Sequence, residues 1–276
     1  MRDADDYSGW IGHRISRSEI VTDRMVEHFR LTLTGTRGPL GVPAGFHWCL
    51  APDAVEPADF GRDGHPRTGI FLPALPLPRR MWAGGEVVWS GEIGLGDTVE
   101  RISTIRDVTF KQGRSGPLGF VTVDHEYLVG GEVRIRDRQD IVYREDPKPG
   151  VQPAPKAGEP WEPVRSWKIT PTSTLLFRYS ALTFNGHRIH YDHPYATGVE
   201  GYDGLVVHGP LQSTWMQNLA ADLLGRLPAS FAYRGLSPLT CDRPVTVEAR
   251  QTDEGIELRV RRDEDGVVTM QGLARA

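Results

Sequence analysis

Cysteine is scarce in this sequence of 276 residues, and long apolar runs are absent. The two cysteines, Cys49 and Cys241, are far apart and form no C-x-x-C pattern, which argues against a disulfide framework or a cysteine-based zinc site. Charged residues or glycine interrupt every apolar stretch before the roughly 18 residues that a membrane helix needs. The opening M-R-D-A-D-D-Y-S-G-W also lacks the apolar core of a signal peptide. We therefore expect a cytoplasmic protein that does not span a membrane.

An excess of positive charge is also lacking, because 32 Lys and Arg residues face 36 Asp and Glu residues, for a formal net charge of −4. Nucleic-acid binding depends on basic residues that displace counterions, so we expect no nucleic-acid partner. The sequence contains no phosphate-binding P-loop, no G-x-S-x-G nucleophile elbow and no dinucleotide fingerprint. We expect neither a cofactor nor a metal ion.

Proline, in contrast, is abundant in one segment that divides the chain. Residues 146–166 contain repeated prolines, which remove backbone donors and favour an extended linker. The chain is also longer than a typical single domain. We expect an N-terminal unit over residues 1–145, this linker, and a C-terminal unit over residues 167–276.

The N-terminal unit has the pattern of half-buried antiparallel strands, rich in β-branched residues and separated by glycine-containing turns. The predicted strands are Glu86–Ile93, Val99–Val108, Phe120–Val129 and Val133–Tyr143. Val21, Met25 and Phe29 recur at helical spacing and predict one short helix that begins near Thr22. Residues 38–78 are dense in proline, glycine and aromatics, and we expect an ordered loop that wraps a pocket.

The C-terminal unit has two predicted helices followed by strands. Thr172 or Ser173 caps the first helix, which ends at Asn185-Gly186. The second, Pro210–Leu224, carries a wide apolar stripe. The predicted strands are Val245–Arg250, Ile256–Arg261 and Val267–Leu273. Antiparallel sheets that each wrap a central helix bury both surfaces, which predicts an α+β fold. The long helix is shortened or lost in the first half, which leaves room for a ligand there.

Two neighbouring motifs carry a family resemblance: Y-S-A-L-T-F-N-G-H-R-I-H-Y-D at Tyr179–Asp192 and G-Y-D-G-L-V-V-H-G-P-L at Gly201–Leu211. They resemble the MaoC-like, or hydratase 2, enzymes. More narrowly, the chain is similar to double hot dog hydratases of the mesaconyl-C4-CoA or itaconyl-CoA type and to the related mitochondrial-type 3-hydroxyacyl thioester dehydratases. Leu77–Gly85 and Lys111–Leu118 extend the resemblance into the first half. It implies a double hot dog fold, one active site in the second half, reversible hydration of a 2-enoyl-CoA, and a homodimer.

Hydration of an enoyl thioester needs a base for the water, an acid for the α-carbon, and donors for the thioester oxygen. Histidine titrates near neutrality, which makes His190 the first candidate for proton transfer. The backbone N–H of Gly209, at the start of the long predicted helix, is placed to donate to the thioester oxygen with the help of the helix dipole. We therefore predict His190 and Gly209 as catalytic.

The loop departs from the pattern of the resembled family, G-D-x-N-P-[IV]-H, in which the Asp and His hold the water together. Here Asn185 replaces the Asp, His187 the Asn and Arg188 the Pro. An amide is no general base, so Asn185 orients the water while His190 moves the proton, or Asp192 or His187 supplies the base. Asp192 has a second interpretation as the cap of a helix that begins next to it.

Arginines suggest the class of substrate. Arg79, Arg80 and Arg188 offer contacts for a carboxylate or a CoA phosphate, which favours a branched dicarboxylic thioester such as mesaconyl-C4-CoA or itaconyl-CoA, hydrated to a citramalyl-CoA. His187 and His208 complete the expected substrate contacts, with solvent exposure and packing as their structural alternatives. Two other functions remain open: a dehydratase of straight-chain 3-hydroxyacyl-ACP or 3-hydroxyacyl-CoA, and a non-catalytic thioester-binding domain.

Overall fold

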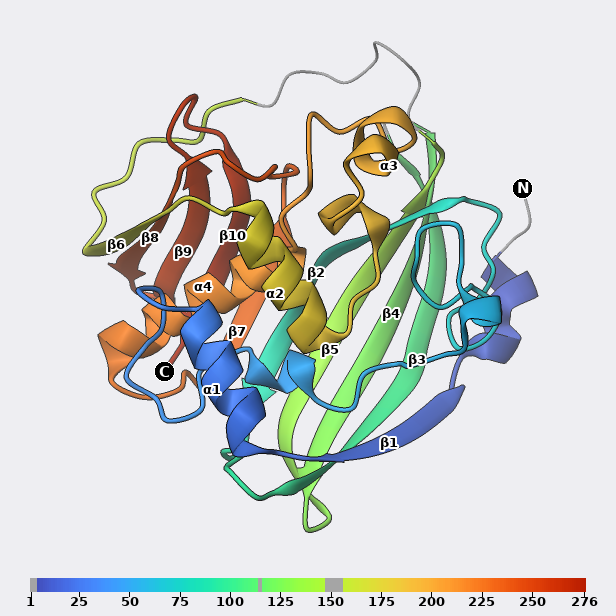
Figure 1. The fold of residues 1–276 in the computed structure, drawn as a ribbon, viewed down its shortest axis with the longest axis horizontal. Coiled ribbons are helices and arrows are strands. Elements are labelled where there is room, and N and C mark those ends of the chain that lie inside the picture. The colour runs from blue at the N-terminus through green and yellow to red at the C-terminus, as the bar shows by residue number, and fades with distance from the viewer. Residues whose placement is uncertain (1–3, 114–115, 147–155) are drawn as a thin grey trace.

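The computed structural model describes residues 4–113, 116–146 and 156–276. Within these residues, ten strands form one antiparallel sheet in the order β1-β3-β4-β5-β2-β7-β10-β9-β8-β6 (Figure 1). The N-terminal strands are β1 (Arg14–Ile20), β2 (Arg79–Trp89), β3 (Thr98–Gly113), β4 (Gly116–Val129) and β5 (Glu132–Arg144). The C-terminal strands are β6 (Arg165–Ile169), β7 (Ser230–Gly235), β8 (Val245–Thr252), β9 (Gly255–Arg262) and β10 (Val268–Arg275).

The two halves of the sheet repeat one strand order. Counted inward from each edge, the first half is β1-β3-β4-β5-β2 and the second is β6-β8-β9-β10-β7. Strands β2 and β7 pair at the centre, from Gly84 opposite Arg234 to Val88 opposite Ser230. This repeat is the double hot dog arrangement, and it confirms the α+β fold that the sequence predicts.

Short helices follow the edge strand of each half. The N-terminal one is α1 (Asp23–Thr32) and its counterpart is α2 (Ser173–Thr183). The hydroxyl oxygens of Thr22 and Thr172 accept hydrogen bonds from backbone N–H groups in the first turns, so both helices have the predicted N-caps. Figure 1 shows α1 and α2 on the same face of the sheet, where they contact each other.

The long helix α4 (Gly209–Leu224) fills the second half. Residues 211–221 are all buried, and the helix packs against β8, β9 and β10. Trp215 and Leu219 belong to a core that also includes Phe29 and Val87 from the first half. Burying both the helix and the inner sheet face removes apolar surface from water, which is the main favourable contribution to folding.

The first half has no counterpart of α4 among the described residues. Between α1 and β2 the chain forms only the 3-10 helices Phe46–Cys49 and Pro57–Asp59, which confirms the predicted loss of the long helix. Aromatic side chains pack together instead: the Trp48 ring lies 5.3 Å from that of Trp82, and the Trp82 ring lies 4.7 Å from that of Tyr233.

Some predicted boundaries were wrong. The sequence analysis missed β1, β6 and β7, and it started β2 at Glu86, although β2 begins at Arg79. Strands β1 and β6 are mostly exposed edge strands and carry no apolar alternation that distinguishes them from loop. Helix α2 ends through the left-handed conformation of Phe184 (φ 50°), not at Asn185-Gly186. Of the predicted linker, residues 147–155 lie outside the described part of the chain.

The junction of β2 and β7 leaves no room for a side chain at Gly85. A Cβ atom there would lie 2.0 Å from the carbonyl oxygen of Arg138 and 2.5 Å from the hydroxyl oxygen of Tyr233. Because backbone atoms of a paired strand cannot move aside, we expect Gly85→Ala to lower the free energy of unfolding by about 3 kcal/mol. Denaturant unfolding measures this change.

The control is Gly41→Ala, whose added Cβ meets no atom within 4 Å. We expect the control to change the free energy of unfolding by less than about 0.5 kcal/mol. Similar losses in the two variants would contradict the steric explanation.

Candidate active site

The predicted catalytic loop, residues 184–192, connects α2 to the short helix α3 (His193–Gly198). The backbone N–H of Asn185 donates to the Ser180 carbonyl oxygen at 2.8 Å and closes the end of α2. The loop then forms a single 3-10 turn, Arg188–His190, which buries Ile189 and His190. This turn places His190 beneath the surface.

His190 is held by the backbone of the segment before α4. Its Nδ1 lies 2.7 Å from the carbonyl oxygen of Val206. A carbonyl only accepts, so Nδ1 carries the proton and Nε2 of the neutral ring keeps a lone pair. Burial lowers the pKa of His190 to about 3, although the Val206 carbonyl opposes this shift. The ring is therefore neutral at physiological pH and is oriented as a proton acceptor.

His208 and Gly209 complete the surroundings of His190 at the start of α4. The His208 ring stacks on the His190 ring with centroids 3.5 Å apart, and its Nε2 lies 2.8 Å from the Ser180 hydroxyl oxygen. His208 is completely buried, so its contact is with His190 and not with solvent. Gly209 is the first residue of α4, where backbone N–H groups have no partner within the helix. A Cβ at this position would lie 2.6 Å from the ring of Trp82.

Asn185 and Asp192 are both turned toward the backbone. The Asn185 Oδ1 accepts a hydrogen bond from the backbone N–H of His187 at 2.9 Å. The Asp192 Oδ1 caps α3 by accepting from the N–H of Tyr195, and its Oδ2 accepts from Arg188 Nη2 at 2.7 Å. Hydrogen bonds to Arg188 and Tyr195 lower the pKa of Asp192. The structure thus supports the capping interpretation of Asp192, and neither side chain has a hydrogen bond to His190 among the described residues.

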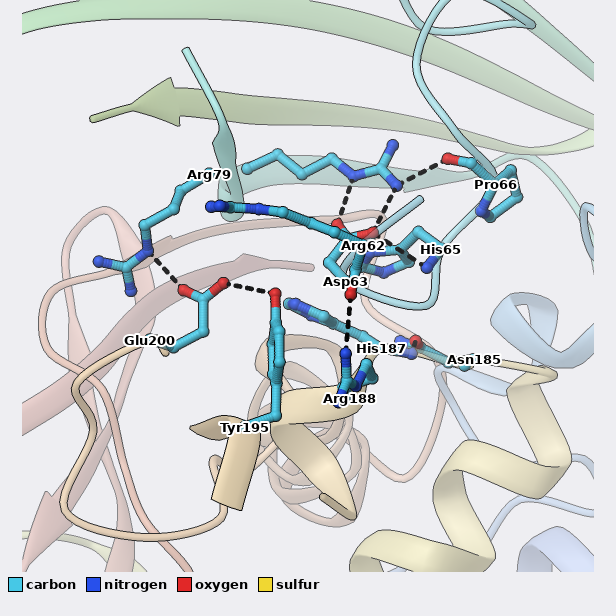
Figure 2. Close-up of polar contacts among 12 residues, drawn as sticks. Arg62, Asp63, His65, Pro66, Arg79, Asn185, His187, Arg188, Tyr195 and Glu200 are labelled. Atoms are coloured by element: carbon cyan, nitrogen blue, oxygen red, sulfur yellow. Dashed lines mark hydrogen bonds and ion pairs between the residues drawn. The ribbon is translucent and has the colours of Figure 1, made fainter. Parts of the chain in front are cut away.

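His187 lies between His190 and a histidine from the first half of the chain. Its ring centroid is 5.4 Å from that of His190 and 4.3 Å from that of His65. His65 belongs to the loop of residues 61–67, which we call the covering loop. The Nδ1 atom of His65 lies 3.1 Å from Asp63 Oδ2. Figure 2 shows Asp63 and His65 over His187.

The sequence analysis missed Asp63 and His65. The only local signal is a charged D-G-H in a stretch otherwise rich in proline and glycine. The sequence analysis also missed Glu200, because no motif marks it as a partner of Arg79.

The covering loop and the catalytic loop touch through their backbones. The N–H of Arg188 donates to the Asp63 carbonyl oxygen at 2.8 Å. Gly64 has a φ of +87°, and a Cβ there would lie 2.1 Å from the carbonyl oxygen of Gly186. Only glycine permits both this left-handed conformation and this close approach. The first half of the chain therefore contributes directly to the site.

Charges and burial around the covering loop keep Asp63 ionised and the neighbouring histidines neutral. Burial alone would raise the pKa of Asp63, but His65 and Arg80 outweigh it and hold that pKa well below its usual range. Burial lowers the pKa of His65, with Asp63 acting in the opposite direction. Burial also lowers the pKa of His187, and His65 and His190 add to the shift. At neutral pH the group is thus one carboxylate and a row of neutral imidazoles.

Asp63, His65 and His187 also offer potential metal-ligand atoms within 4.8 Å of one another. Both oxygens of Asp63, however, already accept hydrogen bonds from His65 and Arg80. The guanidinium of Arg80 would also repel a cation at this place. The donor set fits a hydrogen-bonded network better than a metal site.

The arginines predicted to bind substrate have carboxylate partners within the protein. Arg79 is 3% exposed, and its Nε lies 2.5 Å from Glu200 Oε2. Arg80 pairs with Asp63 and donates to the Pro66 carbonyl oxygen at 2.7 Å. Arg79 Nη1 is buried without a hydrogen-bond partner among the described residues. Figure 2 shows Glu200 between Arg79 and the Tyr195 hydroxyl, which donates to it at 3.0 Å. Arg188, paired with Asp192, lies over the Tyr195 ring.

The comparisons with known proteins identify the family of this chain. The family model described as "Hydroxyacyl-thioester dehydratase type 2" matches residues 45–241, which include both loops and α4. The chain belongs to this family. A mesaconyl-C(4)-CoA hydratase of Chloroflexus aurantiacus is 38% identical over 264 residues, which are 93% of this chain and 93% of that protein.

Solved structures at low sequence identity show the same fold. A MaoC-like dehydratase from Phytophthora capsici aligns with a TM-score of 0.70 at 12% identity, covering 100% of this chain and 98% of that one. A Mycobacterium tuberculosis protein described as a double hot dog fold aligns with a TM-score of 0.55 at 13% identity, covering 99% and 98%. In the part of the chain that the structure describes, no helix has the length and apolar character to cross a membrane.

The contact between the two loops predicts an effect of Gly64→Ala. Both Gly64 and Gly69 have positive φ angles, so alanine is strained at either position, but a Cβ on Gly69 has its nearest neighbour at 4.0 Å. We expect Gly64→Ala to push the covering loop away from Gly186 and to break the bond from the Arg188 N–H. The Arg188 amide should then exchange its proton with solvent at least about ten times faster.

Hydrogen exchange followed by NMR measures this rate. Gly69→Ala serves as the matched control and should leave the exchange of Arg188 unchanged. Unchanged protection of Arg188 in Gly64→Ala would contradict the close approach.

Proposed function

We propose that this protein catalyses the reversible addition of water to the double bond of a 2-enoyl-CoA thioester. The observation that carries the proposal is the neutral, buried His190, whose proton is fixed on Nδ1 by the Val206 carbonyl. Its Nε2 lone pair is therefore available next to the N-terminus of α4. Membership of the hydroxyacyl-thioester dehydratase type 2 family supports the same chemistry.

In the hydration direction, His190 acts first as base and then as acid. Its Nε2 takes a proton from water, and the water oxygen bonds to the β-carbon of the thioester. The electron pair of the double bond moves toward the thioester oxygen, where the N–H of Gly209 stabilises the developing charge. His190 then returns the proton to the α-carbon, so that the enzyme ends in its starting state.

We further propose a branched dicarboxylic substrate such as mesaconyl-C4-CoA or itaconyl-CoA. Two observations support it: the similarity to the mesaconyl-C(4)-CoA hydratase over nearly the whole of both chains, and the buried, unpartnered Nη1 of Arg79. A substrate carboxylate that reaches Arg79 competes with Glu200. Arg80 and Arg188 are more exposed and lie nearer to where the CoA moiety enters in this proposal.

A cytoplasmic homodimer is part of the same proposal, with units over residues 1–145 and 167–276. The repeated strand order of the two halves supports the division into two units. The straight-chain dehydratase is the alternative that a substrate panel separates most directly.

The role of His190 is tested by His190→Ala. We expect kcat for hydration of mesaconyl-C4-CoA or crotonyl-CoA to fall by about three orders of magnitude, because the proton acceptor is lost. The assay follows the loss of absorbance of the conjugated thioester. The control is His193→Ala, which removes an exposed histidine at the start of α3 and should retain the rate. Normal turnover in His190→Ala, with the fold intact by circular dichroism, would disprove the assignment.

The substrate carboxylate is tested by the double variant Arg79→Gln with Glu200→Gln. Changing Arg79 alone would leave a buried, unpaired carboxylate at a cost of about 3–5 kcal/mol, whereas the double change removes both charges. We expect kcat/KM to fall at least about tenfold more for mesaconyl-C4-CoA than for crotonyl-CoA.

The matched control is Arg259→Gln with Glu248→Gln, a buried ion pair of 2.6 Å in the C-terminal sheet. It should affect the two substrates equally. Equal losses for both substrates in the Arg79 and Glu200 variant would mean that this pair does not recognise the carboxylate.

A further inference from the structure

Two polar residues of the catalytic loop, Asn185 and Asp192, are already engaged and do not serve as a second proton acceptor beside His190. Asn185 stands where the resembled family has an acid, and its Oδ1 is already used by the backbone N–H of His187. Asp192 has both oxygens engaged by Arg188 and by the start of α3. A water molecule that attacks carbon has two O–H groups, and His190 accepts only one of them. The remaining acceptor in the catalytic loop is His187, whose ring packs against His65 of the covering loop.

We propose that Asp63, His65 and His187 form a relay that provides this second acceptor, with His187 contacting the water and the other two acting as positioning residues. This inference rests on the proposed hydratase function. In this proposal, Asp63 of the covering loop supplies the negative charge that the catalytic loop lacks at Asn185.

His187 and His190 are close neighbours in the site. Their ring centroids are 5.4 Å apart, and the ring planes are nearly perpendicular at 87°. Hydrogen bonds to water are about 2.7–3.2 Å long, so a single water between the ring edges can reach a nitrogen of each. The perpendicular rings direct their nitrogen lone pairs differently, as two O–H groups of one water require.

The protonation pattern of the relay follows from its far end. The Asp63 carboxylate can only accept, so the proton of His65 lies on Nδ1 and its Nε2 keeps a lone pair. His65 and His187 are in ring contact, with centroids 4.3 Å apart. No hydrogen bond joins these two rings among the described residues, so His65 acts on His187 by packing and by the charge of Asp63 behind it, while His187 presents a ring nitrogen to the water as an acceptor.

The charge at the end of the relay makes His187 a better acceptor. Arg80 fixes the Asp63 carboxylate through Nε at 3.0 Å and is itself anchored to the Pro66 carbonyl oxygen. A fixed carboxylate polarises the histidine that donates to it, as in other carboxylate and histidine pairs. The atoms balance without a net change in the relay: one water proton passes to His190 and on to the α-carbon, while the second stays on the oxygen that bonds to the β-carbon.

The test compares kcat and KM of two variants, Asp63→Asn and His65→Asn, on the enoyl-CoA that the wild type hydrates. In His65→Asn, the amide can still donate to Asp63, so the covering loop keeps this contact. The imidazole ring that packs on His187 is lost. We expect each variant to lose about 100-fold in kcat, with KM within about threefold of the wild type and the fold intact by circular dichroism.

Members of one relay also act as a unit. The double variant should therefore be no slower than His65→Asn alone, whereas independent structural effects would multiply. The matched control is Asp59→Asn, which removes a carboxylate paired with Arg67 beside the covering loop but without a histidine. It should keep the wild-type kcat.

The outcomes separate the relay from the function on which it rests. A wild-type protein that hydrates no enoyl thioester overturns both. Three results with an active wild type overturn the relay alone. Either the two variants retain kcat, or only their KM changes, or their losses in kcat multiply in the double variant. One equivalent of tightly bound zinc in the purified protein, with activity lost on chelation, would also overturn it in favour of a metal site.

Discussion

The pairing of β2 with β7 is the constraint on which the site depends. It joins two five-stranded halves into a single sheet and so fixes the start of β2 relative to the second half. Arg80 lies at that start and holds Asp63 and Pro66 of the covering loop. The loop in turn rests on the backbone of Arg188. A strand pairing at the centre of the sheet thus determines which side chains surround His190.

Burial decides how these side chains handle protons. His187, His190 and His208 are all buried, and burial lowers the pKa of each. They are neutral at physiological pH, and each neutral ring offers one donor and one acceptor. Groups that can only accept set the direction of two hydrogen bonds in the site: the Val206 carbonyl for His190 and the Asp63 carboxylate for His65. The hydrogen bonds of the site therefore depend on which nitrogen of each neutral ring carries the proton, and not on charged histidines.

Features that depend on local sequence were predictable, and those that depend on distant contacts were not. The apolar stripe of α4, the caps at Thr22 and Thr172, and the capping alternative for Asp192 were read from neighbouring residues and are present in the structure. Asp63 and His65 were missed because their meaning arises only when the covering loop meets a loop far along the chain. Edge strands β1 and β6 gave too little apolar alternation to be recognised.

The division of the site between the two halves has a consequence for how this protein can change. In a repeated fold, two equal halves are free to diverge separately, but here each half holds part of one site. A substitution at His65 changes the packing of His187, and a substitution at Gly186 changes the contact with Gly64. The halves of two relatives are therefore not interchangeable, and a chimera has to take both loops from the same parent.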